Sequence, residues 1–191
     1  MSDAASRKKL GSLWLIAALT TAPVAASYLI YYFWPPVHTV NYGDLIGPQP
    51  LPDPALTLAD GAPFRLSQLR GRWALVSVDS GKCDAHCDEK LLYMRQLRLT
   101  QGKDAERVER VWLISDDVPP RADSIARYQG TWLVRAAAGG LSRLFPAQGV
   151  VSDHIYVVDP LGNLMMRFPR DPDPRRMIKD LARLLRASQI G

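Results

Sequence analysis

Cys83 and Cys87 are the only cysteines of the chain, and their type and spacing allow disulfide or metal-binding chemistry. They follow an apolar run at residues 73–78 and precede a segment with helically spaced apolar residues at 88–100. The free N–H groups and the dipole at a helix N-terminus favour a thiolate. Two sulfurs on a first helical turn can face each other. We therefore expect this pair to close into a disulfide or to hold one metal ion.

Three histidines are candidates for a further ligand: His38, His86 and His154. His38 lies in a proline-rich segment, and we interpret it as an interfacial polar residue. His86 lies between the cysteines, so it can reach the same ion or point to solvent. His154 opens an apolar run at 155–158, which places it at the end of a predicted strand. The alternative for His154 is a surface histidine at a strand start.

Four interpretations of the cysteines compete. A structural disulfide over so short a loop stabilises little, because the constraint on the unfolded chain grows with loop length. A redox dithiol usually has two intervening residues, and this pair has three. A soft metal site is the third interpretation, since two thiolates and an imidazole suit copper. Buried free thiols are the fourth, which the polar neighbours Lys82, Asp84 and Asp88 disfavour.

Hydrophobic patterning along the chain predicts the elements that must position these residues. A turn signal at Asp60-Gly61 separates two short strands. The predicted strands cover residues 56–58, 64–66, 73–78, 111–114, 131–134, 155–158 and 164–168, and the predicted helices cover 88–100, 121–128, 141–145 and 175–188. Strand–helix–strand units imply parallel strands with helices on both faces, and the late hairpin makes the sheet mixed. We predict an α/β fold, a thioredoxin-like mixed central sheet flanked by helices.

In thioredoxin-like redox proteins a proline usually precedes the strand that faces the active cysteines. Val151-Ser-Asp-His154 has no proline at that place. A histidine there would point at the thiols. The fold prediction thus adds His154 to the candidate site of Cys83 and Cys87.

The N-terminal region predicts a membrane anchor. Residues 10–34 form a run without a charged side chain, longer than the roughly 20 residues that a spanning helix needs. Arg7, Lys8 and Lys9 precede it, which favours a cytoplasmic N-terminus. We predict a cytoplasmic segment at 1–9, an anchor at 10–34, a proline-rich spacer at 35–54 and an exported thioredoxin-like domain at 55–191. The alternative is a cleaved signal peptide, with Val24-Ala-Ala-Ser27 as its small-residue cleavage site.

Composition excludes several classes of protein. Hydrophobic residues make up 47% of the 191 residues, and the net charge is only +5, which is ordinary for a globular chain. Two cysteines and three histidines are too few for a zinc-finger array or a disulfide-dense scaffold. The sequence has no phosphate-binding glycine loop and no basic-aromatic pattern for nucleic acid. A single small site in an exported domain remains.

The motifs of the chain resemble those of the Sco (SenC-type) family of membrane-anchored, thioredoxin-like copper-binding factors. The resemblance runs from about residue 50 to 188 and rests on Cys83, Cys87, the distal Asp153-His154 and a Val158-Asp-Pro-Leu-Gly162 turn. It implies that Cys83, Cys87 and His154 bind copper as Cu(I). It also implies a role in assembling the CuA site of cytochrome c oxidase. The family pattern has proline after each cysteine, where this chain has Asp84 and Asp88.

The leading hypothesis is therefore a copper chaperone, rather than an enzyme, in the inner (plasma) membrane with its domain in the periplasm. Its expected partners are the oxidase subunit that carries the CuA site, a thiol reductase or another copper chaperone, and the membrane; no nucleic acid is expected. The alternative is a membrane-anchored thiol-disulfide reductase with Cys83 and Cys87 as its redox residues, acting on the copper-binding cysteines of a partner. A binding module with a structural disulfide and no metal is the third hypothesis.

Overall fold

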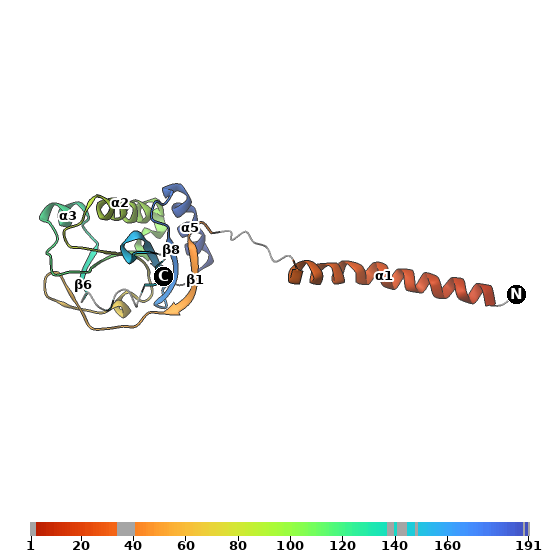
Figure 1. The fold of residues 1–191 in the computed structure, drawn as a ribbon. Helices are drawn as coiled ribbons and strands as arrows, with labels where there is room; N and C mark the ends of the chain where they lie inside the picture. Colours follow the sequence, from red (N-terminus) through yellow and green to blue (C-terminus); the bar gives the residue numbers. More distant parts are fainter. Residues whose placement is uncertain are drawn as a thin grey trace. The chain divides into compact units, whose positions relative to one another are not determined.

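The computed structural model describes residues 3–33, 41–136, 140, 145–147, 149–188 and 190. The chain divides into two compact units, Met1–Val40 and Asn41–Gly191. The first contains helix α1, Asp3–Phe33, and the second contains all other elements labelled in Figure 1. The predicted helix at 141–145 and His38 of the predicted spacer fall at least in part outside the described residues.

Helix α1 has the properties of a membrane span. Its 31 residues extend about 46 Å at 1.5 Å per residue. Within it, Trp14–Phe33 is a 20-residue stretch with a mean hydropathy of 1.5 and no buried side chains. This length and composition support the predicted anchor. Which way the helix crosses stays a prediction.

The second unit is built on one mixed sheet, which has eight strands within the described residues. Their order is β1-β8-β7-β4-β5-β6-β2-β3. The strands are β1 Asp44–Pro50, β2 Leu56–Leu58, β3 Pro63–Phe64, β4 Trp73–Asp79, β5 Val108–Ile114, β6 Trp132–Arg135, β7 Ile155–Val158 and β8 Asn163–Phe168. Strand β5 pairs in parallel with β4 and β6, whereas the other pairs are antiparallel. This confirms the predicted mixed sheet.

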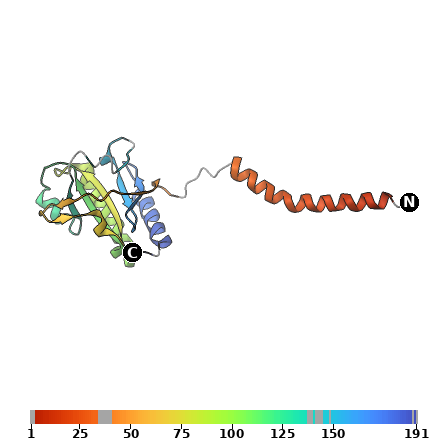
Figure 2. The ribbon, with the colours of Figure 1, turned by 90° about the horizontal axis from the view of Figure 1, so that it is seen from below.

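The central strands are buried on both faces. Every residue of β4 and β5 is buried, as expected for apolar runs in parallel strands. On one face, helices α2 (Ala85–Thr100) and α5 (Pro174–Ala187) pack against the sheet beside each other (Figures 1 and 2). Leu91 and Met94 of α2 and Leu181 of α5 are at most 1% exposed there. A third helix, α3, covers Ala122–Arg127.

The opposite face is covered differently. Its buried residues include Phe64, Val76, Val111 and Tyr156. In the part of the chain that the structure describes, this face carries the short 3₁₀ helices η1 (Leu66–Leu69) and η3 (Val151–Asp153) in place of a long helix. The remaining 3₁₀ helix, η2, covers Gly102–Arg107. The sequence predicts helices on both faces. The α-helices are confirmed on the face of α2 and α5, and the described residues of the other face carry 3₁₀ helices.

Part of the predicted proline-rich spacer belongs to the sheet. Strand β1 pairs with β8, and the main-chain N–H groups of Tyr42 and Gly43 donate to Asp180 Oδ2 at 2.6 and 2.8 Å. The prolines are tolerated because β1 is an edge strand, which leaves one row of N–H groups unpaired. Asp44–Pro50 is therefore a sheet strand rather than a spacer, and the compact unit begins at Asn41.

Most other predicted elements differ from the observed ones only at their ends. The hairpin at 56–66 is present as β2 and β3, but Leu66 opens η1. The helix expected from residue 88 begins at Ala85, because Asp84 caps it. The Asp84 carboxylate accepts a hydrogen bond from the Cys87 N–H at 2.9 Å. The earlier start places Cys87 inside the first turn of α2.

Candidate functional site

The loop between β4 and α2 carries the two cysteines, which are joined by a disulfide. Cys87 is 1% exposed, whereas Cys83 is only partly buried. Cys83 has φ of 46°, a left-handed conformation that side chains other than glycine rarely adopt. Two residues earlier, the loop is tightly packed at Gly81, because a Cβ there would lie 1.7 Å from the Val118 carbonyl oxygen. A partner thiol can therefore approach Cys83 more readily than Cys87.

A cleft of about 810 Å³ opens beside the disulfide. Residues from four segments line it: Asp79, Ser80, Lys82, Cys83, Asp84, Ala85, His86, Cys87, Ser115, Arg121, Ser152, Asp153 and Arg170. Both cysteines line the cleft, as do Asp84, which follows Cys83, and Asp153, which precedes His154. His154 itself does not line the cleft. Ser152 and Asp153, which directly precede His154, line the cleft with the cysteines, and the orientation of His154 toward the thiols stays a prediction.

A buried ion pair lies in this region. Lys90 is 1% exposed, and its ammonium donates to Asp79 Oδ1 at 2.8 Å and to the main-chain oxygen of Ser152. The second carboxylate oxygen of Asp79 accepts from Ser77 Oγ at 2.8 Å. Burial raises the pKa of Asp79 and lowers the pKa of Lys90, while their mutual attraction opposes both shifts. The ion pair connects the end of β4, the cysteine helix α2 and the segment that leads to His154.

His154 is held in one orientation at the start of β7. Its ring Nδ1 lies 2.8 Å from the Phe168 carbonyl oxygen. A carbonyl can only accept, so Nδ1 carries a proton, and in the neutral ring Nε2 then carries the lone pair. Nε2 is buried and has no hydrogen-bond partner. Strand β7 pairs antiparallel with β4, and Ile155 lies opposite Ser77, so His154 is near the carboxyl end of β4. The cysteine loop leaves β4 at that same end.

His86 is the second imidazole near the cysteines. It lies on the first turn of α2, lines the cleft, and has a buried Nε2 without a hydrogen-bond partner. In the disulfide form, no group of three His, Cys, Asp or Glu side chains in the described residues is arranged to hold a metal ion. The set Cys83, Cys87 and His154 is therefore not assembled as a ligand group in this state.

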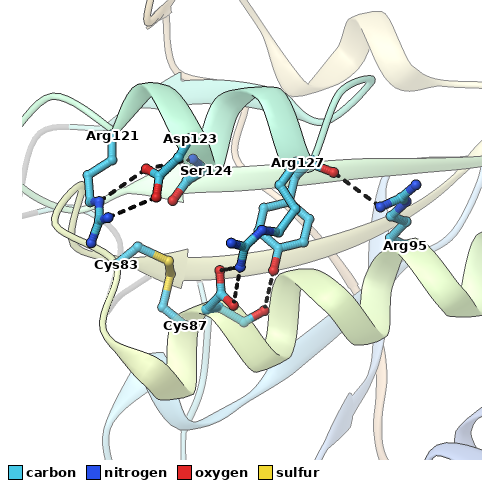
Figure 3. A network of polar contacts seen from close by, with 9 residues as sticks. Cys83, Cys87, Arg95, Arg121, Asp123, Ser124 and Arg127 are labelled. Carbon is cyan, nitrogen blue, oxygen red and sulfur yellow. Dashed lines mark hydrogen bonds and ion pairs between the residues drawn. A yellow bond between two sulfur atoms is a disulfide. The ribbon is translucent and has the colours of Figure 1, made fainter.

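The aspartates that follow each cysteine have structural roles. Asp84 caps α2, as described above. Asp88 accepts from Arg127 Nη1 at 3.1 Å, and its main-chain oxygen accepts from the Tyr128 hydroxyl at 3.0 Å. Figure 3 shows how these bonds join α2 to α3 next to the disulfide, with the Arg121–Asp123 ion pair on the side of Cys83. Asp84 and Asp88 therefore fix the two helices around the cysteines.

Asp79 and Lys90 belong to this region, although neither is among the residues predicted from the sequence. A signal for Lys90 exists, because it stands in the apolar stripe of α2, three residues after Cys87 and next to Leu91. Residues three apart on a helix share a face, so a lysine at that place must be buried. Asp79 ends a strand in which every other residue is also buried. A lone carboxylate there calls for a cationic partner.

Comparison with known proteins identifies the family. The family model described as "Transmembrane-like, thioredoxin-like, C-terminal domain" matches residues 73–188, which is more than half of the chain. The chain belongs to this family. None of the curated proteins matches this chain in sequence. The thioredoxin-like fold predicted from the sequence is thus confirmed.

Solved structures of the Sco family share the fold. Yeast Sco1 with copper bound has 12% identity and a TM-score of 0.64, and the match covers 74% of this chain and 96% of that one. Bradyrhizobium japonicum ScoI with copper bound has 17% identity and a TM-score of 0.54, over 70% and 98% of the two chains. BsSco, a member of the Sco family of cytochrome c oxidase assembly proteins with a disulfide switch, has 12% identity and a TM-score of 0.56, over 76% and 98%. At these identities the likeness establishes the fold.

Proposed function

We propose that this thioredoxin-like protein is a copper chaperone that binds Cu(I) through Cys83, Cys87 and His154. It delivers the ion to the subunit of cytochrome c oxidase that carries the CuA site. The observation that carries the proposal is the state of His154, whose Nδ1–H is fixed on a carbonyl while Nε2 is buried and unpartnered. Histidines that ligate metals typically donate their other N–H in this way, which fixes the tautomer.

The donor set suits the proposed cargo. Two thiolates and one imidazole are soft and borderline ligands of the kind that select Cu(I). Relatives of the same fold support the choice, since yeast Sco1 and Bradyrhizobium japonicum ScoI have been solved with copper bound. The BsSco relative is described as a cytochrome c oxidase assembly protein, which supports the proposed destination.

The disulfide must open before the ion binds. Two electrons and two protons convert the Cys83–Cys87 disulfide into two thiols, and a dithiol reductant supplies them while it becomes a disulfide itself. The helix N-terminus around Cys87 then favours loss of the thiol proton on binding. Cu(I) passes to the partner as the partner's ligands replace these ligands one at a time, without a change in oxidation state.

A thiol-disulfide reductase is the second candidate, and the unequal burial of the cysteines favours it. The more accessible Cys83 is placed to form a mixed disulfide with a partner cysteine, and the buried Cys87 is placed to resolve it. The product would be a reduced partner and the Cys83–Cys87 disulfide. Such exchange needs no contribution from His154, which separates the two candidates.

The proposed role requires the domain on the outer side of the membrane. The basic residues Arg7, Lys8 and Lys9 favour a cytoplasmic N-terminus, and the proposed topology therefore has the domain that follows α1 in the periplasm. A reporter that functions only after export, fused behind Gly191, should be active. Activity of a reporter that functions only in the cytoplasm would overturn the proposed location.

The test of the function is a Cu(I) competition titration of the reduced protein against a chelator. We expect His154→Ala to weaken Cu(I) binding by about 10- to 100-fold, the range seen when the surroundings of a metal site are altered. His86→Ala is the matched control, because His86 also has an unpartnered buried Nε2 but is not in the proposed ligand set. Equal affinities of the wild type and His154→Ala, with both folded, would favour the reductase.

A further inference from the structure

Lys90 connects two segments that the proposed copper site must bring together. It belongs to α2, the helix that begins at the cysteines, and it lies three residues after Cys87 on the same buried face. Its ammonium donates to the main-chain oxygen of Ser152 in η3. Because His154 directly follows η3 as its C-cap, one side chain links the cysteine helix to the histidine segment.

The link is built into the interior of the protein. Lys90 is 1% exposed and Asp79 is 5% exposed, so water competes little with their bond. Asp79 holds the ammonium from the end of β4 at 2.8 Å and is itself fixed by Ser77. A lysine has three N–H donors, and the two acceptors lie on different elements. The bond to Asp79 therefore fixes the position from which the ammonium reaches the Ser152 carbonyl.

His154 depends on this link for its placement. Its ring has one hydrogen bond, to Phe168 of β8, and that bond fixes the ring relative to the sheet. It does not fix the ring relative to α2. In the described residues, the Lys90 bond to Ser152 is a direct polar contact between the cysteine helix and η3. Other contacts hold η3, namely the Tyr156 hydroxyl, which donates to the Val151 carbonyl, and the Arg170–Asp153 ion pair, but neither partner belongs to α2.

We propose that Lys90 is a positioning residue that sets the distance between the cysteine pair and His154. It acts through the Ser152 carbonyl and does not touch the ion. This inference rests on the proposed copper site. It assigns a role to a buried charge that the proposed ligand set does not use.

The test compares a variant that keeps the bond from Lys90 to Ser152 with a variant that loses it. Asp79→Asn retains the Lys90 ammonium and its bond to Ser152, and serves as the control. Asp79→Asn combined with Lys90→Met removes the link without leaving a buried charge unpaired. In chelator competition of the full-length reduced protein, we expect the combined variant to bind Cu(I) about 10-fold more weakly than the control.

The addition of His154→Ala to both variants shows whether Lys90 acts through the histidine. Residues that act as one unit have non-additive effects. We expect His154→Ala to weaken Cu(I) binding in the Asp79→Asn protein and to add no further loss in the combined variant. The same fold-loss in both backgrounds, or equal Cu(I) affinity of the combined variant and its control, would overturn the inference.

A measurement without metal separates this inference from the proposed function. Amide hydrogen exchange of residues 151–154 in the metal-free protein should be at least about 10-fold faster in the combined variant than in Asp79→Asn. If the wild type fails to bind Cu(I), or if His154→Ala costs nothing, the proposed function fails. Unchanged exchange in residues 151–154 would overturn the positioning role of Lys90 whether or not copper binds.

Discussion

The cysteine loop, residues 80–87, and the histidine segment, residues 151–154, differ in one respect: a disulfide closes the first, and a buried lysine contacts the second. Within the cysteine loop, Cys83 N–H donates to the Ser80 carbonyl and Cys87 N–H donates to Asp84. These bonds join residues that are close in sequence, and a further bond from the Gly81 N–H to Asp116 Oδ1 spans 35 positions. The histidine segment also has local bonds, from the Asp153 N–H to the Val150 carbonyl and from the His154 N–H to the Val151 carbonyl. In addition, it is held by Lys90 and, through its last residue, by Phe168. These two contacts span 62 and 14 positions of the chain.

The difference indicates that the two halves of the proposed site can respond separately. The cysteine loop carries its own cap and disulfide, so local interactions hold the two cysteines together, and Gly81 also binds Asp116. The histidine segment takes its place from the assembled sheet and from a buried ion pair. A perturbation of the core should therefore displace His154 before it displaces the cysteines. Copper affinity should reveal such a displacement, whereas disulfide formation should not.

Removal of the cysteines gives the largest expected effect. Cys83→Ser combined with Cys87→Ser leaves one imidazole and no thiolate, so Cu(I) binding should be lost completely. The measurement is the copper-to-protein ratio of the reduced, anaerobically loaded protein after a chelator wash. The wild type should retain one copper ion per chain, and the double variant none. Copper retained by the double variant would move the site away from this loop.

Loss of one partner of the buried ion pair gives the next largest effect. Asp79→Asn weakens the pairing of the Lys90 ammonium, and breaking a buried pair costs about 3–5 kcal/mol. Urea unfolding of residues 41–191 should show this fall in the free energy of unfolding. Asp79→Leu combined with Lys90→Met should cost less than the single change, since no charge stays unpaired. A larger cost for the double variant would contradict the ion-pair account.

Part of this site follows from the sequence because its contacts are local. The pair Cys83 and Cys87, its place between a buried strand and a helix, and the mixed sheet all follow from spacing and periodicity. Strand β1 was missed because Gly47, Pro48 and Pro50 indicate a spacer, and only pairing with β8 makes an edge strand of them. The partners of His154 and Lys90 were missed because they lie on elements distant in sequence. Their contacts arise only when the sheet and α2 pack together.

The cap of α2 gives the smallest expected effect. Asp84→Ala removes the carboxylate that accepts from the Cys87 N–H, which should cost about 1 kcal/mol of unfolding free energy. It also removes a negative charge beside the thiols, so their pKa should fall in the reduced protein. Iodoacetamide reactivity against pH measures this shift. Asp173→Ala is the matched control, because Asp173 caps α5 far from the cysteines in sequence and should leave thiol reactivity unchanged. A shift of the same size in Asp173→Ala would contradict the local effect.

The most direct test of the proposed site is X-ray absorption at the copper edge. The sample is the full-length reduced chain, loaded with one Cu(I) in detergent under anaerobic conditions. Two sulfur ligands and one imidazole nitrogen should surround the ion, and His154→Ala should remove the nitrogen while both sulfurs remain. Two sulfur ligands alone in the wild type would contradict the central claim that the cysteine loop and the histidine segment together hold copper.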